Sequence, residues 1–527
     1  MYSIIINSQE TITNTLKKIW DKEIFFLLFF LFFIIHGEML FNKISWWDDI
    51  TGVFGSAPDY NMPLPHGRWF GWLLEPFFTS GSLPVFNGII VAVCISLSSL
   101  ILFNMFHIQN KIHKILLGLI LISIPAVSAN LGYMGSSGSN FIGILLCICG
   151  AYLSCLSIHI SQKLTAQYWL GAVLFACSLG EYQCYFSLYL SLCLLFFIHS
   201  ILSKPITFKE FYNCCGYYVI NVCAGLIIYL AVLQVALRFA DVRLLHYAHT
   251  DTYGIVPFLD YLERLGFSYY LFFNPYLCSS ANMFPFKWNG WYIILLSLNI
   301  LLSAMVVGMT FRTGKKETRF QFYMLILLLP CALNFNVILY GWEPLHSLHV
   351  YHQFALFLLP LVLFMSIQNI SHQRAFNSLI RTAHIATIFS IFIFVFLYVR
   401  YDNYCYMLSE LRLSQSIRYF TTLATKIMSL KDYNENFPVV FINERKKRSN
   451  ADTIQEFYDY PVTNPYGYPF LNSYPGSSRA FLKHWCGYTP VFGDAKKFER
   501  NDFVIKMPNY PNDGSIKIID NVIVVKF

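Results

Sequence analysis

Residues 24–35 read IFFLLFFLFFII, an unbroken apolar run that follows Asp21-Lys22-Glu23. Such a run is stable in hydrocarbon as a helix, because each backbone N–H and C=O then bonds within the segment. No small-residue cleavage site follows it, so we interpret it as a first membrane helix and not as a signal peptide. Working outward from this run, similar apolar segments recur over the first 400 residues.

The composition agrees with this interpretation. The chain is 56% hydrophobic, 18% aromatic and 13% charged, whereas about 25% of the residues of an ordinary soluble domain are charged. These values predict an integral membrane protein surrounded by the lipid bilayer. The chain has no phosphate-cradling glycine loop, which argues against a nucleotide-driven pump, and we expect no nucleic-acid partner.

Eleven apolar segments approach the ~20 residues that cross a bilayer. They are 24–42, 84–106, 115–131, 141–158, 168–180, 184–202, 214–237, 291–311, 320–340, 351–369 and 383–399. Lysine and arginine gather in alternate loops, which the positive-inside rule places in the cytoplasm. The sequence therefore predicts a polytopic α-helical membrane protein with about 11 transmembrane helices, a cytoplasmic N-terminus and a C-terminus on the outer side.

The C-terminal part is expected to be a separate domain, 401–527, following a membrane domain at 1–400. An amphipathic stretch at 405–430 predicts a helix, and β-rich runs at 437–442, 503–507 and 516–527 predict strands. We expect a small α/β domain on the outer side. Its basic run, Arg445-Lys446-Lys447-Arg448, is typical of a solvated loop or of a contact with lipid headgroups or an anionic glycan. A disulfide among Cys278, Cys405 and Cys486 is left open.

The loop 36–83 carries the most suggestive polar residues. Asp48 and Asp49 follow the first apolar run, and the loop continues to His66-Gly67-Arg68-Trp69. A carboxylate at the membrane boundary is suited to deprotonate an attacking hydroxyl. An arginine there is suited to hold a phosphate by two parallel hydrogen bonds. The alternatives are solvated loop acids and an arginine that extends to the interface.

Other residues have two interpretations each. Trp46, Trp47 and Trp69 suit either an interfacial belt or a sugar-stacking groove. Glu181 and Gln183 lie in a predicted tight turn between 168–180 and 184–202, and capping a helix is the favoured role for Glu181. His349 and His352, three residues apart, suit a structural role better than a metal site. No cofactor is firmly predicted, and a divalent cation is left open.

With these residues in place, the chain resembles the Gtr-type O-antigen glucosyltransferases, serotype-conversion enzymes of the GT-C class. The resemblance rests on Asp48-Asp49, Gly67-Arg68-Trp69, the Glu181-Tyr182-Gln183 turn and the many spans. It is most specific in residues 45–75 and weaker in the C-terminal part.

The resemblance implies inverting transfer of glucose from undecaprenyl phosphate-glucose to an O-antigen repeat unit of lipopolysaccharide. The reaction would take place on the periplasmic face of the bacterial inner membrane, which makes the C-terminal domain periplasmic. A donor-lipid flippase and a donor-synthesising glycosyltransferase would be functional partners. The acidic site would map onto Asp49 and Asp48, and the donor phosphate site onto Arg68 with His66.

Two other functions remain as alternatives. An O-antigen polymerase would rely on arginines of the outer loop 238–290, here Arg238, Arg243 and Arg264. A transporter of lipid-linked glycans would carry charged groups deep within its spans. Nearly all charges of this chain lie outside the apolar segments, which counts against a transporter.

Overall fold

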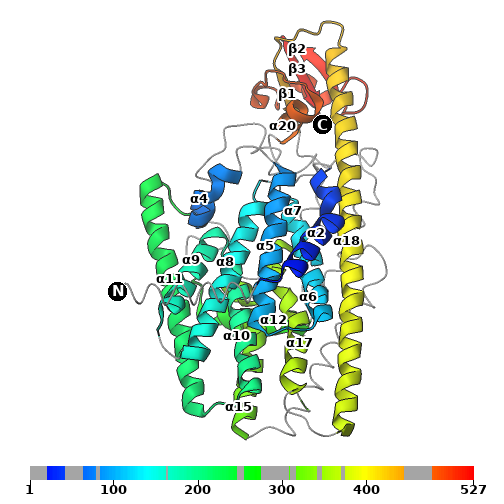
Figure 1. Ribbon diagram of the computed structural model, residues 1–527. Coiled ribbons are helices and arrows are strands. Elements are labelled where there is room, and N and C mark those ends of the chain that lie inside the picture. The colour runs from blue at the N-terminus through cyan, green and yellow to red at the C-terminus, as the bar shows by residue number, and fades with distance from the viewer. Residues whose placement is uncertain are drawn as a thin grey trace.

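A computed structural model describes residues 20–41, 63–78, 83–133, 135–161, 164–245, 255–273, 308, 316–340, 347–368, 374–443 and 477–527. In these parts the chain is a bundle of helices with a small sheet beyond one end (Figure 1). One core of buried apolar side chains joins the helices of the bundle, from Ile24 to Tyr406. The predicted helical character is confirmed, and several of the helices are apolar enough to cross a membrane.

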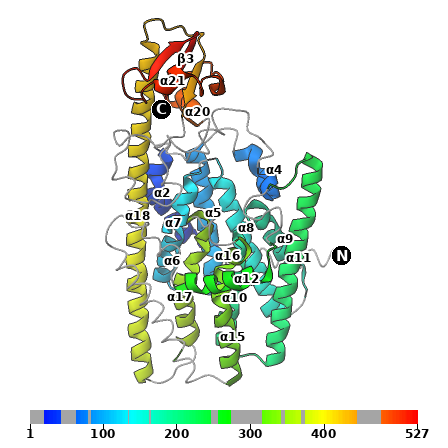
Figure 2. The ribbon, with the colours of Figure 1, turned by 180° about the vertical axis from the view of Figure 1, so that it is seen from behind.

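The helices follow the apolar segments of the sequence. Those before residue 245 are α2 (Lys22–Phe41), α4 (Trp69–Phe78), α5 (Pro84–Met105), α6 (Lys111–Ser123), α7 (Pro125–Leu131), α8 (Ser137–Leu156), α9 (Ala166–Glu181), α10 (Tyr185–Ser203) and α11 (Phe208–Ala240). Those after it are α12 (Phe258–Phe273), α15 (Lys316–Leu333), α16 (Phe335–Tyr340), α17 (Ala355–Gln368) and α18 (Arg374–Met428). Figures 1 and 2 place α18 on one flank of the bundle and α11 on the opposite flank.

The number of spans is smaller in the described part than the eleven predicted. Six helices are long and apolar enough to cross a membrane, or seven if the bent pair α6–α7 forms one span. Helix α9 has only 16 residues, and α15 opens with the polar run Lys316-Glu317-Thr318-Arg319. Apart from Gly308, the predicted span 291–311 lies outside the described residues. The count of eleven therefore stays a prediction.

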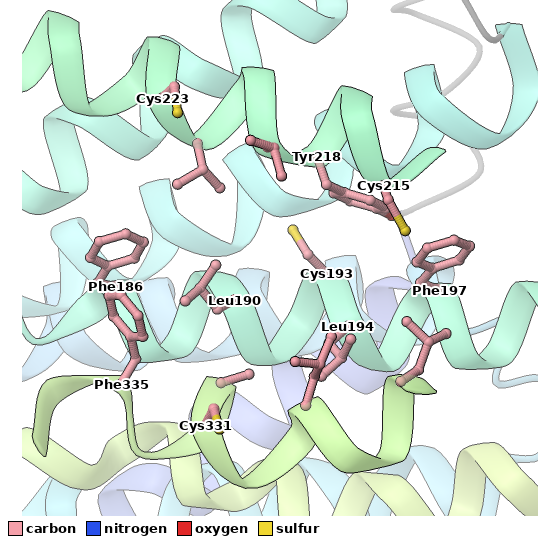
Figure 3. A pocket seen from close by; sticks show the side chains of 15 residues that line it. Phe186, Leu190, Cys193, Leu194, Phe197, Cys215, Tyr218, Cys223, Cys331 and Phe335 are labelled. Carbon is pink, nitrogen blue, oxygen red and sulfur yellow. The ribbon is translucent and has the colours of Figure 1, made fainter. Parts of the chain in front are cut away.

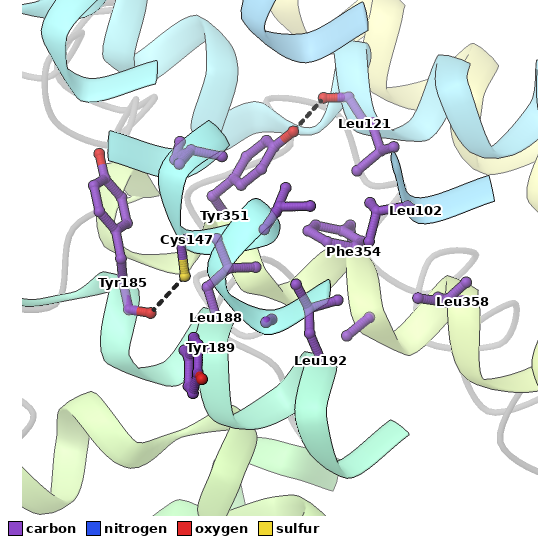
Figure 4. Close-up of a cluster of buried hydrophobic side chains, with 14 of the residues drawn as sticks. Leu102, Leu121, Cys147, Tyr185, Leu188, Tyr189, Leu192, Tyr351, Phe354 and Leu358 are labelled. Atoms are coloured by element: carbon purple, nitrogen blue, oxygen red, sulfur yellow. Dashed lines mark hydrogen bonds between the residues drawn. The ribbon is translucent and has the colours of Figure 1, made fainter. Parts of the chain in front are cut away.

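The bend between α6 and α7 has an identifiable cause. Pro125 has no N–H, so the carbonyl of Leu121 loses its helical partner and the chain turns by 44°. The Tyr351 hydroxyl donates to the Leu121 oxygen at 3.3 Å, within the buried cluster of Figure 4. The next carbonyl, of Ile122, lies 3.0 Å from Nε2 of His36. Side chains of two other elements thus bond two successive carbonyls at the bend, of which the proline frees that of Leu121.

Helix α18 changes the predicted organisation near residue 400. It runs without interruption from Arg374 to Met428, 55 residues or about 80 Å at 1.5 Å per residue. The predicted span 383–399 and the amphipathic stretch 405–430 are therefore one helix. The proposed domain boundary at residue 400 falls inside it.

The end of α18 packs against the C-terminal sheet. Strands β1 (Val439–Ile442), β2 (Ile516–Ile519) and β3 (Val522–Lys526) lie in the order β1-β3-β2. β1 is parallel to β3, with Val440 opposite Val524, and β2 is antiparallel to it. A second buried cluster joins Phe420 and Ile427 of α18 to this sheet and to α20 (Ser477–Cys486).

One of the predicted strands is wrong. Residues 503–507 do not join the sheet, because Asp502–Lys506 form the short helix α21. The side chain of Asn501 accepts hydrogen bonds from the N–H groups of Phe503 at 2.9 Å and Val504 at 3.3 Å. This N-cap starts a helix in a segment whose composition favours a strand.

The disulfide left open from the sequence is settled for one of its pairs. Cys405 and Cys486 form no disulfide with each other. Cys278 lies outside the described residues.

The contribution of the Tyr351 hydroxyl, which bonds the Leu121 carbonyl at the α6–α7 bend, can be tested. We expect Tyr351→Phe to lower the free energy of unfolding by about 1–3 kcal/mol, because it leaves the buried Leu121 oxygen without a donor. The measurement is thermal unfolding of the detergent-solubilised protein. Tyr212→Phe, at a tyrosine that is 62% exposed, is the control. Equal melting temperatures for the two variants would contradict this account of the bend.

Candidate functional site

The segment that carries Arg68 begins with a tight turn. Leu64–His66 form one turn of 3-10 helix, and Gly67 follows with φ 77°, a left-handed conformation that favours glycine. The N–H of Gly67 donates to the Leu64 oxygen at 2.9 Å. This turn places Arg68 directly before the first residue of α4.

Side chains from the α9–α10 turn and from α11 hold this turn by its carbonyls. Nε2 of Gln183 donates to the His66 oxygen at 2.8 Å. The Tyr229 hydroxyl, on α11, donates to the Gly67 oxygen at 3.0 Å. Nε2 of Gln183 also donates to the hydroxyl oxygen of Tyr229 at 3.1 Å. The predicted supporting residue Gln183 thus positions the turn that carries Arg68, and His66 takes part through its backbone.

The predicted tight turn between two helices is present. α9 ends at Glu181 and α10 begins at Tyr185, although α9 packs mainly on α8 and α11. The guanidinium carbon of Arg68 lies 4.0 Å from the centre of the Tyr182 ring, a cation–π contact. The turn therefore meets the start of α4 at Arg68.

Glu181 does not have the capping role that we favoured from the sequence. It is the last residue of α9, and the N-cap of α10 is Cys184, without a side-chain cap. Two glycines make room for the Glu181 side chain. A Cβ at Gly71 would lie 3.3 Å from its Oε2, and a Cβ at Gly143 would lie 2.7 Å from its Cγ. The side chain thus lies between α4 and α8.

The electrostatics of Glu181 follow from this burial. Glu181 is 4% exposed and lies just beyond the predicted span 168–180. Burial raises its pKa from 4.5 to about 7, while the Ser139 hydroxyl and the charge of Arg68 lower the pKa. A carboxyl group with a pKa near neutrality exchanges protons readily at physiological pH.

Trp69 lies in the core of the bundle. It is 6% exposed, and a Cβ at Gly180 would lie 2.5 Å from Cε2 of its ring. The indole therefore packs against α9, and its face is covered by this contact. Of the three predicted tryptophans, it is the one that the structure describes.

The structure describes some of the remaining predicted site residues, and the others lie outside the described ranges. Asp48, Asp49, Trp46 and Trp47 lie within 42–62, outside the described residues, and their roles stay predictions. His352 is 3% exposed. Within the described ranges, no group of three or more His, Cys, Asp or Glu residues could hold a metal ion.

A polar network that the sequence indicated only faintly lies close to Glu181, because the side chains of Glu181 and Tyr185 both pack against Gly143. The Tyr185 hydroxyl donates to the Asn140 oxygen at 2.9 Å, and Nδ2 of Asn140 donates to Oδ1 of Asn130 at 3.0 Å. Small residues around Ser139 suggested close approach of backbones there. Nothing in the sequence pointed to Tyr229, because its role depends on a contact between distant segments.

The raised pKa of Glu181 gives a test of its burial. A folded-state pKa above the unfolded value means that ionised Glu181 destabilises the fold fully above pH 7, and that this penalty disappears as pH falls through 7 toward 4.5. Relative to wild type, Glu181→Gln should therefore gain stability between pH 5 and 8, by about 3 kcal/mol at most. Melting curves across this range measure it. The control is Glu23→Gln, at a side chain that is 81% exposed, and its melting temperature should change with pH as that of wild type does. The same pH dependence for Glu181→Gln would contradict the burial argument.

Comparisons with known proteins identify the family of the chain. No curated protein and no solved structure matches the chain. A family model described as Glucosyl transferase GtrII matches residues 37–360, more than half of the chain. The matched region includes Gly67-Arg68-Trp69, the Glu181-Tyr182-Gln183 turn and the helices that hold them. The chain therefore belongs to the GtrII glucosyl transferase family.

Proposed function

We propose that this glucosyl transferase moves glucose from undecaprenyl phosphate-glucose to an O-antigen repeat unit. The reaction takes place on the periplasmic side of the bacterial inner membrane and leads to serotype conversion. The N-terminus is then cytoplasmic and the C-terminal sheet periplasmic. A donor-lipid flippase and a donor-synthesising glycosyltransferase supply the lipid-linked sugar.

The observation that carries this proposal is the position of Arg68. Its guanidinium lies at the start of α4, beside Tyr182 and close to Glu181. The carbonyls of His66 and Gly67 accept hydrogen bonds from Gln183 of the α9–α10 turn and from Tyr229 of α11. Arginine presents two parallel N–H groups that match two phosphate oxygens. A half-buried arginine held in this way suits a phosphate that carries increasing negative charge as it leaves.

The chemistry balances with groups of this chain. The acceptor hydroxyl oxygen attacks the anomeric carbon of glucose, and the bond from that carbon to the phosphate oxygen breaks on the opposite face, which inverts the configuration. The hydroxyl proton passes to a carboxylate, for which we propose Asp49 or Asp48. The phosphate leaves on undecaprenol with its added charge next to Arg68. Trp46 and Trp47 remain candidates for stacking on the acceptor sugar.

Glu181 fits a positioning role in this scheme. Its carboxyl group lies against Gly71, three residues after Arg68 in the chain, and the charges of Glu181 and Arg68 interact. When Glu181 is ionised it orients and partly neutralises Arg68, and when it is protonated Arg68 offers a full charge to phosphate. We propose that Glu181 tunes the affinity of Arg68 for the leaving group.

Of the three arginines expected of a polymerase, Arg238 and Arg243 are exposed and Arg264 is engaged by backbone carbonyls. Arg264 donates to the oxygens of Ile338 at 3.3 Å and Leu339 at 2.8 Å, and so bonds carbonyls in the last turn of α16. This contact is a structural role. It favours the transferase over the polymerase alternative.

The phosphate role of Arg68 is tested by a change that keeps the charge. We expect Arg68→Lys to slow glucosyl transfer roughly 10- to 100-fold, since losing one charge-assisted hydrogen bond costs about 1.5–3 kcal/mol. The assay follows labelled glucose from undecaprenyl phosphate-glucose to lipopolysaccharide in membranes with matched protein levels. Arg381→Lys, at an exposed arginine, should keep the wild-type rate. Wild-type rates for both Arg68→Lys and Arg68→Ala would remove Arg68 from the site.

The proposed base is tested by paired substitutions. One of Asp48→Asn and Asp49→Asn should be stable in the membrane yet slower by ~10²–10⁴, because asparagine keeps the shape and cannot accept the proton. We expect the larger loss at Asp49. The same transfer assay, together with the O-antigen structure of a host with and without each variant, gives the answer. Normal glucosylation by both variants would make Glu38, Asp59 and Glu181 the acids to examine.

A further inference from the structure

Two side chains of opposite charge meet at the start of α4. The guanidinium carbon of Arg68 lies 4.0 Å from the centre of the Tyr182 ring. The carboxyl group of Glu181 lies against Gly71, three residues after Arg68 in the chain, and the charges of Glu181 and Arg68 interact. An anion that binds Arg68 therefore also meets the charge of Glu181.

Burial determines the charge state of Glu181. The residue is 4% exposed, and its Oε2 has no hydrogen-bond partner among the described residues. Burial raises the pKa of the carboxyl group to about 7, although the Ser139 hydroxyl and the charge of Arg68 lower the pKa. The group is therefore close to half ionised at neutral pH, where a change in the charge of its surroundings changes its protonation most.

The other titratable groups around Glu181 cannot balance its charge. The only other charged side chain of α4 is that of Glu75, which is also negative. From α8, a glycine and a serine face the carboxyl group. On the α10 side, burial raises the pKa of the Cys184 thiol well above its usual value, and the Tyr185 hydroxyl donates a hydrogen bond and is neutral. Arg68 is therefore the cation that acts on Glu181.

The helix that follows the turn leads into apolar surroundings. Phe186, Leu190 and Cys193 of α10 line a groove between α10, α11 and α15 (Figure 3), and no charged side chain lines this groove. The charge of Glu181 is therefore balanced from the α4 side and not from α10.

Glucosyl transfer changes the charge of the phosphate. In the donor the phosphate is a diester with one negative charge. When the bond from the anomeric carbon to the phosphate oxygen breaks, the electron pair stays on that oxygen. The phosphate becomes a monoester, whose charge is between about −1.5 and −2 at neutral pH. The hydroxyl proton of the acceptor goes to the aspartate that we propose as the base. The phosphate next to Arg68 therefore gains negative charge in each turnover.

We propose that Glu181 takes up a proton from the periplasmic solvent when a lipid-linked phosphate binds Arg68, and releases this proton together with undecaprenyl phosphate. The inference rests on the proposed function, because that function places the phosphate at Arg68. Two negative groups next to one cation repel each other, which disfavours the ionised form of Glu181. The product has the larger charge and therefore favours protonated Glu181 most strongly.

This coupling has opposite effects on the two ends of the reaction. Above pH 7 Glu181 is mostly ionised in the free site, so a phosphate binds only as the carboxyl group becomes protonated, and the affinity for the donor falls. Below pH 7 the protonated carboxyl group stabilises the bound product, and undecaprenyl phosphate leaves more slowly. Donor binding and product release are thus both possible near neutral pH.

Calorimetry on the wild-type protein in lipid nanodiscs measures the proton directly. The probe is undecaprenyl methyl phosphate, a diester whose phosphate does not titrate near neutral pH, so a proton taken up on binding enters the protein. Titrations at pH 7.5 in HEPES and in Tris, which differ in ionisation enthalpy, should show uptake of about half a proton or more per bound lipid. Binding without uptake, or with release, would overturn the proposal.

Two matched substitutions identify the group that takes up the proton. The wild-type affinity for the diester should fall roughly tenfold from pH 6 to pH 8. Glu181→Gln should abolish both the proton uptake and this fall. Glu75→Gln, the same change at a buried carboxyl group of α4 that is 7% exposed, should keep both. Uptake that persists in Glu181→Gln, or is lost equally in Glu75→Gln, would overturn the assignment. The wild-type titration decides the matter if Glu181→Gln does not reach the membrane.

The product gives a further test. With undecaprenyl phosphate, the difference in proton uptake between wild type and Glu181→Gln should be larger than with the diester, because the monoester carries more charge. A smaller difference would overturn the link to product release.

Binding and transfer measurements separate this inference from the proposed function. Proton uptake at Glu181 in a protein that transfers no glucose would leave the coupling in place and overturn the proposed function. Glucosyl transfer by a protein that takes up no proton on binding the diester would overturn the coupling and leave the proposed function.

Discussion

The fixed geometry of the Gly67 turn is the constraint on which the site depends. Two backbone carbonyls, of His66 and Gly67, accept hydrogen bonds from Gln183 and Tyr229. These donors belong to segments more than a hundred residues away in the sequence. A loop held by its carbonyls keeps its shape whatever its side chains do. The backbone geometry of this turn therefore fixes the position of Arg68, directly before α4 and beside Tyr182.

A second constraint is that a carboxyl group is buried next to this arginine. Space for Glu181 exists because Gly71 and Gly143 lack side chains. An ionised carboxylate in such surroundings is costly unless a cation lies near it. The resulting pKa of about 7 reflects both effects, with burial the larger. The same two glycines bring α4 and α8 close together, so the packing and the electrostatics of the site have one origin.

Local patterns predicted the elements of this fold well, and contacts between distant segments decided the rest. Apolar runs located the helices, and the residues around Gly180 located the turn between α9 and α10. The helix Asp502–Lys506 was missed, because the Asn501 cap outweighs the β-rich composition of residues 503–507. The stretches on both sides of residue 400 were predicted to be helical. Nothing in the sequence there indicates whether they form two helices or the single helix α18.

For the site, the sequence identified Arg68, Glu181 and Gln183 as candidate residues. It did not indicate how these residues lie relative to one another. Residues that meet across helices leave no periodic signal in the chain, so the favoured capping role for Glu181 was wrong. Tyr229 was missed for the same reason. The family match over residues 37–360 adds the class of reaction, which no pattern of hydrophobicity could provide.

The unbroken course of α18 has a consequence for how the C-terminal sheet can vary. Tyr406 still belongs to the bundle core and Phe420 to the core under the sheet, so about 21 Å of rigid helix separates them. Inserting one residue there would move the sheet by only ~1.5 Å along the axis of α18 but rotate it by about 100° about that axis. A seven-residue insertion would lift it by about 10 Å with nearly the same side facing the bundle. The distance of the sheet from the bundle and its rotation about the axis of α18 are thus coupled. Changes in the length of α18 should therefore be tolerated mainly in steps of two turns.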